Sequence, residues 1–303
     1  MFLQFLTTLT FNRMKKILYI LLIASIFTIY SCEDKIDLDL DTGRTQLVID
    51  AFVSSDSTLQ TIRVTQTASY FLNSPTPGVS NAAVSIEGPN NTIYNFSHNS
   101  NGNYTYDPST NGRIDSIGYE YKLKITANNK DYMSVSTLNP SPVIDSITYN
   151  FEEEEPGAEE GYYAQFWSRD FAGRRDWYWI KAFKNKDPID TASYAQYNLS
   201  QDAAFSGDAA DGFIFIVPIR AGITNEDEPF IIGDSVSVEL ISINEVVWNY
   251  LIQVSTQANN GGLFATPTAN IRTNITDIAG QVQNDVLGVF SMSSISRNSI
   301  IIE

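Results

Sequence analysis

Hydrophobic and polar residues alternate along short stretches in the first half of the chain, which is typical of half-buried β-strands. Turn-forming residues such as Asn, Gly and Ser separate these stretches, and no helical periodicity lies between them. The pattern predicts a β-sandwich of the immunoglobulin or transthyretin kind over residues 46–139. The expected strands are residues 47–53, 61–66, 82–88, 92–98, 119–127 and 131–138.

A second β-rich domain is expected over residues 140–303, because Pro140 and Pro142 interrupt the alternation. Two of its strands, residues 162–170 and 176–184, are expected to form a hairpin through the sequence FAGRR. Further strand-like segments follow this predicted hairpin. They cover residues 213–219, 234–243 and 286–296, and the last residues of the chain.

One amphipathic helix is expected near residues 243–258. Ser242 and Glu245 have the spacing of a capping box, and apolar residues from Val247 to Val254 recur at helical spacing. Asparagines and glycines at 259–262 stop the pattern. The apolar stripe implies that this helix covers a sheet.

The amino terminus has the features of an export signal. Lys15 and Lys16 precede an apolar run over residues 17–30, which at 14 residues is shorter than the roughly 20 that span a bilayer. Residues 1–31 are therefore interpreted as a signal peptide. Residues 1–13 lack a basic start of their own, which suggests that translation begins at Met14.

The end of the signal, Ile29-Tyr30-Ser31-Cys32, resembles a bacterial lipobox, although Tyr30 is bulkier than the usual residue. In that class the cysteine thiol receives acyl chains such as palmitate, so Cys32 is the expected membrane anchor. The alternative is that Cys32 only ends an ordinary signal or a membrane helix. Residues 32–45 are acidic and are expected to form a solvated tether, since their alternating aspartates do not complete a calcium loop.

Composition argues against several classes of protein. The chain has a net charge of −16, and without residues 1–31 it has 16 bases against 35 acids. Such a surface repels nucleic acid. One cysteine and one histidine, His98, exclude intramolecular disulfides, cysteine zinc clusters and HExxH sites. Together with the absence of phosphate-binding and nucleophile motifs, this predicts a protein that is not an enzyme and needs no cofactor.

The order of these segments resembles a Bacteroidota lipoprotein family catalogued as domain of unknown function 4249. The resemblance runs from CEDKIDLDL at Cys32 through LVIDAFV, VIDSITYNF, GDSVSVELISI and GGLFATPTANIRTNI to VLGVFSMSSIS. It implies an outer-membrane protein, on the periplasmic or cell-surface face, that assists a TonB-dependent transporter. The family brings no established catalytic residues.

Aromatic residues of the second domain are candidates for ligand binding. Trp177 and Trp179 alternate on one expected strand and so share a face, and Trp167 lies on the neighbouring segment. Exposed, these rings would stack on sugars or peptide side chains. Alternatively they fill the core. Phe264, in a turn-rich stretch after the helix, is a candidate for partner contact or a buried residue of a plain connector.

The acidic run Glu152, Glu153, Glu154 and Glu155 is a weak candidate for calcium binding, because Ca²⁺ prefers oxygen ligands. Such a run is more often simply solvated. The leading functional hypothesis is a lipid-anchored, non-catalytic accessory protein that binds cargo for a TonB-dependent transporter or docks onto it. A surface adhesin or scaffold for glycan or protein polymers is the alternative, and a carboxylate-based hydrolase comes behind both.

Overall fold

The structure is a computed structural model that describes residues 44–69, 74–189, 197–202, 212, 219–261, 265–267, 269–281 and 285–303. Residues from Arg44 to Glu303 form one compact unit. The predicted signal peptide, Cys32 and the acidic tether lie outside the described residues, as do Phe264 and most of the expected strand 213–219. No helix in the described ranges is long and apolar enough to cross a membrane.

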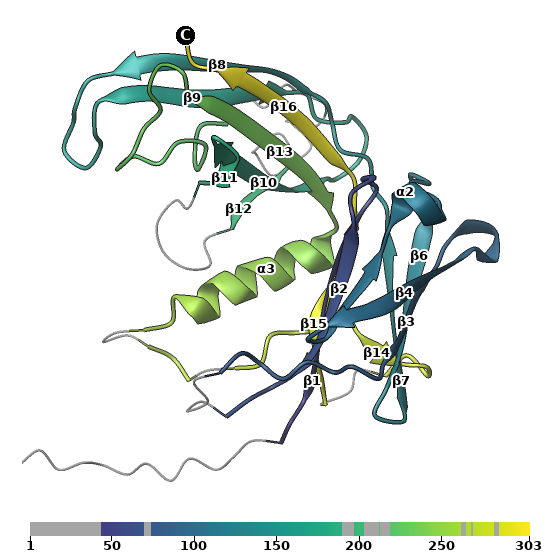
Figure 1. The fold of residues 1–303 in the computed structure, drawn as a ribbon. Coiled ribbons are helices and arrows are strands. Elements are labelled where there is room, and N and C mark those ends of the chain that lie inside the picture. The colour runs from purple at the N-terminus through teal and green to yellow at the C-terminus, as the bar shows by residue number, and fades with distance from the viewer. Residues whose placement is uncertain are drawn as a thin grey trace, which may run out of the picture. The chain divides into compact units, whose positions relative to one another are not determined.

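The described chain is mainly β, which confirms the all-β prediction (Figure 1). Its largest sheet has nine strands in the order β14-β7-β6-β3-β4-β5-β2-β1-β15. These strands are β1 (Leu47–Ser54), β2 (Gln60–Gln66), β3 (Ala83–Glu87), β4 (Ile93–Ser100), β5 (Asn103–Tyr106), β6 (Glu120–Ala127), β7 (Lys130–Thr137), β14 (Thr276–Asp277) and β15 (Val286–Ser293). All six strands expected in residues 46–139 are present, and β5 was not foreseen.

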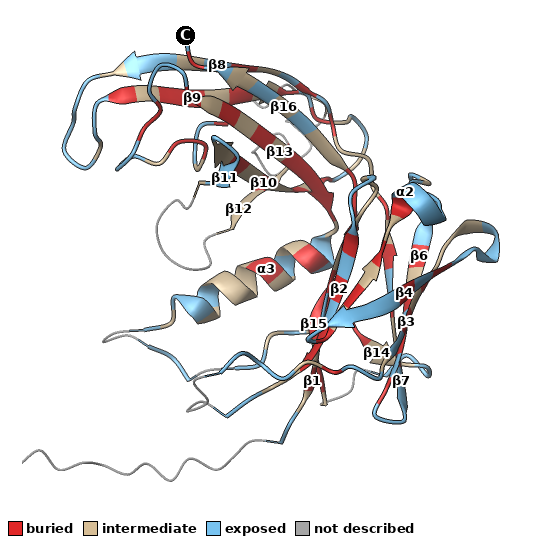
Figure 2. Cartoon of the chain, viewed as in Figure 1, coloured by how far each residue is buried: buried red, intermediate tan, exposed pale blue. Residues whose placement is uncertain are grey.

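This nine-stranded sheet curls around its own hydrophobic core, which gives a β-sandwich-like unit. Alternate residues of β1, such as Leu47, Ile49 and Val53, point into that core, as strand periodicity requires (Figure 2). Strands from opposite ends of the sheet come together: the amide of Met292 on β15 donates to Ser136 Oγ on β7 at 2.9 Å.

The end of the chain belongs to the first sheet, which the division into consecutive domains at residue 140 did not anticipate. β15 pairs in parallel with β1 in the register Leu47↔Val286 to Ser54↔Ser293, and β14 pairs with β7. Phe290 and Met292 are buried in the first core. The chain therefore leaves this core after β7 and returns to it before its end.

A second core lies between a five-stranded sheet and a two-stranded sheet. The first has the order β11-β10-β13-β16, with β12 also paired to β10, and the second is β8-β9. The bounds are β8 (Ile144–Glu152), β9 (Gly161–Ser168), β10 (Trp177–Lys184), β11 (Asp187–Pro188), β12 (Asn198–Gln201), β13 (Ser235–Ile243) and β16 (Ile295–Ile301). Phe166, Tyr178 and Leu240 are among its fully buried residues.

The predicted hairpin between residues 162–170 and 176–184 is wrong. β9 pairs with β8, whereas β10 pairs with β11, β12 and β13. Phe166 of β9 and Tyr178 of β10 share the second core, and Tyr178 Oη donates to Asp170 Oδ1 at 2.6 Å. The connection between these strands therefore carries the chain from one sheet to the other.

Buried serines form hydrogen bonds where the chain passes from β15 to β16. Ser242 Oγ and Ser294 Oγ both donate to the carbonyl oxygen of Asn139, at 2.7 and 2.8 Å. The Ser294 amide donates to Ser242 Oγ at 3.1 Å. Hydroxyl groups here supply hydrogen bonds to backbone groups at the change of sheet, which gives a reason for the serine-rich sequence between the two strands.

The predicted helix is confirmed as α3 (Glu245–Ala258), but its cap differs from the prediction. The side chain of Asn244 accepts from the Val247 amide at 2.9 Å, while Ser242 is still part of β13. Val247 and Leu251 are buried on the face that packs against β10 and β15. Two shorter helical segments are η1 (Pro89–Asn91) and α2 (Pro108–Asn111).

Candidate functional site

Half-buried aromatic residues gather where α3, β1, β10 and β12 meet; we call them the aromatic cluster. They pack on a small buried core of Ile241, Ile243, Val247, Leu251 and Val289. The cluster consists of Phe52, Trp177, Trp179, Tyr197, Trp248 and Tyr250, and the half-buried Leu199 packs on the same core.

Strand periodicity places Trp177 and Trp179 in this cluster. On β10 they alternate with Tyr178 and Ile180, which are buried in the second core on the other face of the sheet. Trp179 lies opposite Leu199 of β12 and Ile241 of β13. The prediction that the two tryptophans share a face is therefore confirmed, and each ring is only partly exposed.

Trp179 packs against two aromatic rings and a lysine. Its ring centroid lies 5.6 Å from that of Phe52 and 5.4 Å from that of Tyr197, both in edge-on geometry. Lys181 Nζ lies 3.9 Å from the centroid of the Trp179 ring, a distance typical of a cation–π contact. Burial lowers the pKa of Lys181, because a desolvated ammonium loses charge stabilisation.

The Asp50 carboxylate lies near two phenols of the cluster, those of Tyr197 and Tyr250. Asp50 on β1 is exposed, yet desolvation by the surrounding protein raises its pKa, against the opposing effect of Arg63 on the next strand. Burial, and to a smaller extent the nearby Asp50 charge, raises the pKa of Tyr197. Burial and then the Asp50 charge also raise the pKa of Tyr250, to about 12. Asp50 is thus accessible to solvent while enough protein surrounds it to weaken its hydration.

The arrangement offers several kinds of contact to a ligand. Aromatic faces and edges pack on apolar surfaces of a ligand, the Asp50 carboxylate accepts hydrogen bonds, and the tyrosine hydroxyls donate or accept them. Trp248 Nε1 is buried and makes no hydrogen bond in the described structure. The cluster itself contains neither histidine nor cysteine, the usual partners in nucleophilic catalysis.

Trp167 lies apart from this cluster. It is on β9, in the other sheet, and its Nε1 donates to Thr148 Oγ1 at 3.2 Å. The structure therefore does not join Trp167 to Trp177 and Trp179, because β9 and β10 are in different layers. Phe264 lies outside the described residues.

The acidic run gives no geometric support for calcium binding. Glu152 forms an ion pair with Arg220, and the described residues contain no group of three acidic, histidine or cysteine side chains placed to hold a metal ion. Glu153, Glu154 and Glu155 follow β8 on the surface. Their position agrees with the simpler interpretation of a solvated acidic run.

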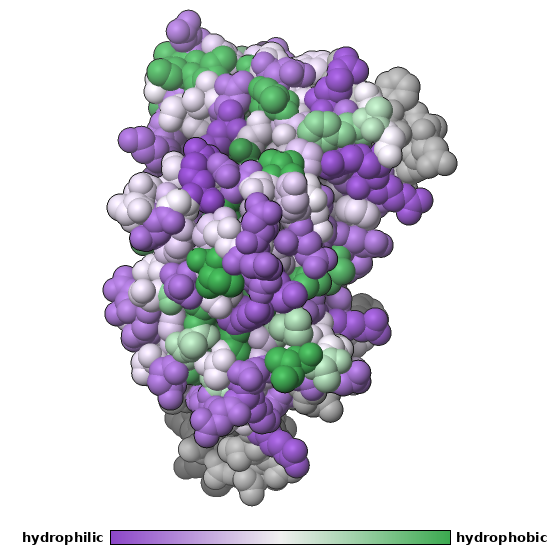
Figure 3. Space-filling model, turned by 90° about the vertical axis from the view of Figure 1, so that its right-hand side faces the viewer, coloured by the Kyte–Doolittle hydropathy of each residue, from purple (hydrophilic) through white to green (hydrophobic). Residues whose placement is uncertain are grey.

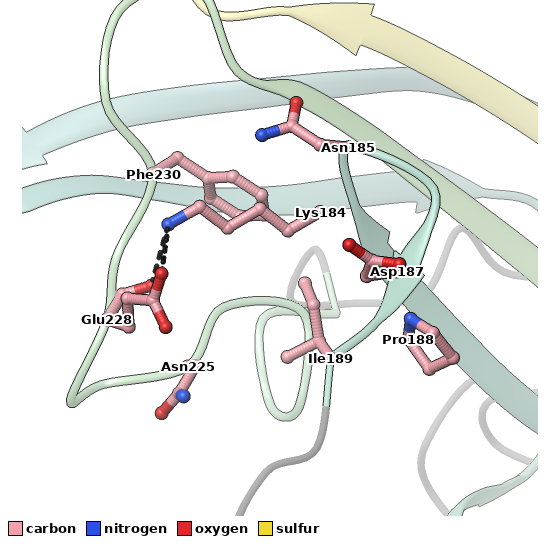
Figure 4. Close-up of a pocket in the computed structure, with 8 residues that line it drawn as sticks. All are labelled: Lys184, Asn185, Asp187, Pro188, Ile189, Asn225, Glu228 and Phe230. Carbon is pink, nitrogen blue, oxygen red and sulfur yellow. Dashed lines mark hydrogen bonds and ion pairs between the residues drawn. The ribbon is translucent and has the colours of Figure 1, made fainter.

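A pocket of about 350 Å³ lies at the far end of β10 (Figure 4). The Lys184 side chain lies along one side of this pocket. Its Nζ donates to the carbonyl oxygen of Pro229 at 3.0 Å and to Glu228 Oε1 at 3.3 Å. The ammonium is thus neutralised by the protein's own groups. The residues that line the pocket are Lys184, Asn185, Asp187, Pro188, Ile189, Asn225, Glu228 and Phe230.

Sequence reasoning missed much of the aromatic cluster. Trp248 and Tyr250 were recognised as part of the apolar stripe of a helix, but their neighbours were not known. Phe52 and Asp50 occupy the outward positions of a strand, where alternation alone predicts solvent. Tyr197 stands in a segment without strong periodicity, and the sequence carries no signal that would have joined it to Trp179.

The family is established by sequence comparison. A family model described as "Domain of unknown function (DUF4249)" matches residues 33–299. The chain belongs to the DUF4249 family. This match confirms the resemblance found from the order of the motifs, and in this DUF4249 protein it includes every strand of both cores except the last residues of β16.

Other comparisons add little to the DUF4249 assignment. No curated protein matches the chain. Among solved structures, the crystal structure of bovine butyrophilin is similar over 65% of this chain and 92% of its own, with 8% sequence identity and a TM-score of 0.20. At that TM-score the likeness carries no functional argument.

Proposed function

We propose that this DUF4249 protein is a lipid-anchored, non-catalytic accessory protein of the outer membrane, which binds cargo for a TonB-dependent transporter or docks onto it. The observation that carries the proposal is the aromatic cluster, in which partly exposed rings and Asp50 meet without a catalytic histidine or cysteine. The lipobox-like sequence at Cys32 and the resemblance to Bacteroidota lipoproteins supply the cellular context.

The anchor follows from the chemistry of Cys32. Each methylene group buried in a bilayer contributes about 0.8 kcal/mol, so several acyl chains on one residue hold a folded protein at a membrane. The acidic chain cannot replace them by adsorbing to anionic headgroups, because like charges repel. A lipid on Cys32 would therefore determine where the protein acts.

Metabolic labelling with palmitate tests the anchor. The wild-type chain is expected to incorporate the label and to fractionate with outer membranes, and Cys32→Ser is expected to lose both properties. Ser31→Ala, which keeps a small residue before the cysteine, serves as the matched control and should behave as wild type. Unlabelled wild-type protein, or Cys32→Ser that stays in the membrane fraction, would refute the anchor.

Affinity purification from native membranes tests the transporter. A β-barrel of the TonB-dependent class is expected to copurify with the wild-type chain. Cross-linking in intact cells before lysis excludes association that forms only after extraction. Repeated recovery of the chain without any such barrel would remove the main support for an accessory role.

A surface adhesin or scaffold remains the second candidate, and the partial exposure of Trp177 and Tyr250 favours it. Aromatic rings also stack on the apolar faces of sugars. A glycan array distinguishes the two functions: binding that Tyr250→Ala abolishes supports the adhesin, and an array without binding counts against it.

A further inference from the structure

A tight turn before β13 exposes two large apolar side chains. Ile231 and Ile232 are 64% and 67% exposed. Turns on protein surfaces are normally built from small polar residues, because exposed apolar side chains gain nothing from folding. Two adjacent isoleucines in such a position therefore need an explanation.

The turn is held rigidly by hydrogen bonds. Asp234 Oδ2 accepts from the Ile231 amide at 2.9 Å, and Asp234 Oδ1 accepts from Asn185 Nδ2 at 2.6 Å. The Gly233 amide donates to the carbonyl oxygen of Ile302 at 2.8 Å, which ties the turn to the end of the chain. A fixed turn presents its side chains to a partner with little loss of conformational entropy on binding.

Two other exposed apolar residues lie next to this turn. Ile301, 58% exposed, pairs with Ser235 directly after the turn. Phe151, 55% exposed, pairs with Tyr162, whose amide donates to the carbonyl oxygen of Phe230 at 2.9 Å. We call Phe151, Ile231, Ile232 and Ile301 the apolar end patch. On the face drawn in Figure 3, hydrophobic side chains form separate groups among polar ones.

Two acidic loops border the apolar end patch. The loop after β8 and the loop before Pro229 lie side by side, because the Glu159 amide donates to the carbonyl oxygen of Glu226 at 2.9 Å. Nine acids lie in these loops and at the end of β8, and only Glu152 and Glu228 pair with bases among the described residues. The nine are Glu152, Glu153, Glu154, Glu155, Glu159, Glu160, Glu226, Asp227 and Glu228.

We propose that the apolar end patch, with these acidic loops as its rim, is a docking surface for a protein whose own contact has an apolar centre flanked by lysine or arginine. The inference rests on the proposed function, since it takes docking onto a partner from there and specifies the chemistry of the partner's contact surface. Charge complementarity would steer such a partner, and the exposed isoleucines and Phe151 would supply the buried centre of the contact. The acidic rim repels both an anionic lipid surface and a second copy of the chain.

A binding assay with designed peptides tests this surface on the purified full chain in detergent. The probe is a fluorescent peptide of alternating lysine and leucine, and the reference is the same peptide with glutamate in place of lysine. We expect the lysine peptide to bind, and its affinity to fall at least tenfold in the double variant Ile231→Ser/Ile232→Ser. Raising the salt concentration should also weaken binding, since the rim contributes by charge.

Ile278→Ser is the matched control, because Ile278 is 73% exposed and directly follows β14, in the nine-stranded sheet. It should leave the affinity unchanged. Glu153→Lys/Glu154→Lys, which alters only exposed side chains, should also weaken binding at least tenfold. Equal binding of both peptides, or an affinity that the isoleucine variant does not change, would overturn the proposal.

Photo-cross-linking in intact cells then identifies the natural partner. A photoreactive residue at position 232 should cross-link to a lysine- or arginine-rich segment of another envelope protein, and one at position 278 should not. Cross-links only to lipid or to a second copy of the chain would refute the proposal. The peptide assay needs neither the lipid nor the transporter, so failure of the proposed function and failure of this surface give different results.

Discussion

Gly288 on β15 lies against the carbonyl group of Ile49 on β1. A Cβ atom at Gly288 would be 1.9 Å from the Ile49 oxygen, and the φ angle of Gly288 is +104°. These two residues are partners in the parallel pairing of β1 with β15. Only glycine allows the last part of the chain to approach the first strand this closely.

Gly288→Ala should therefore destabilise the protein by at least about 3 kcal/mol, because it adds a backbone clash to an unfavourable φ angle. Gly118→Ala is the matched control. Gly118 has a φ angle of +82° but nothing within 4 Å of its Cβ position, so only the conformational cost of about 1–2 kcal/mol applies. Urea denaturation measures both, and equal losses would contradict the close approach of β15 to β1.

Asn244 and Ser242, which both lie just before α3, are expected to have separable effects. Asn244→Ala removes the cap that accepts from Val247 N and should cost about 1 kcal/mol. Ser242→Ala should cost a similar amount through the lost bond to Asn139, without affecting the helix. Amide hydrogen exchange separates them: Asn244→Ala should speed exchange in the first turn of α3. If only Ser242→Ala speeds exchange in that turn, Ser242 rather than Asn244 caps the helix.

Trp179 should matter more for stability than Trp167. Trp179→Ala removes contacts with Phe52, Tyr197 and Lys181, and because the ring is half-buried we expect a loss of roughly 2–3 kcal/mol. Trp167→Ala, on the other sheet, removes a hydrogen bond to Thr148 and should cost about 1 kcal/mol. Denaturation midpoints rank the two, and a reversed order would mean that Trp179 is not packed as described.

Asp50 should oppose folding at neutral pH. Desolvation raises the pKa of Asp50 in the folded state above the usual range of an aspartate, with Arg63 opposing. The ionised form is thus relatively disfavoured in the folded state, and stability decreases as pH rises through this region. Asp50→Asn should raise the urea midpoint at pH 7, with an advantage that vanishes below the unfolded pKa, where the wild-type carboxyl is protonated in both states. A lower midpoint at pH 7 would indicate that Asp50 is stabilised by interaction with Arg63.

Local patterns were sufficient for most individual elements. Alternation identified β1 and its neighbours, and helical spacing identified α3. The hairpin prediction failed because proximity in sequence favours pairing of β9 with β10, whereas their side chains have to cover a common core from two layers. Ser242 was assigned to the helix by its spacing to Glu245, although backbone geometry leaves it in β13 and gives the cap to Asn244.

The sequence by itself determined the β-rich class, the position of the helix, the shared face of Trp177 and Trp179, and the family resemblance, because each depends on residues close in sequence or on the order of motifs. Tertiary structure alone decided that β15 pairs with β1, that Asp50, Trp179, Tyr197 and Tyr250 meet, and that Phe151, Ile231 and Ile301 share one end. These relationships join segments up to 239 positions apart. Their formation depends on how whole sheets pack, which no local pattern of hydrophobic and polar residues encodes.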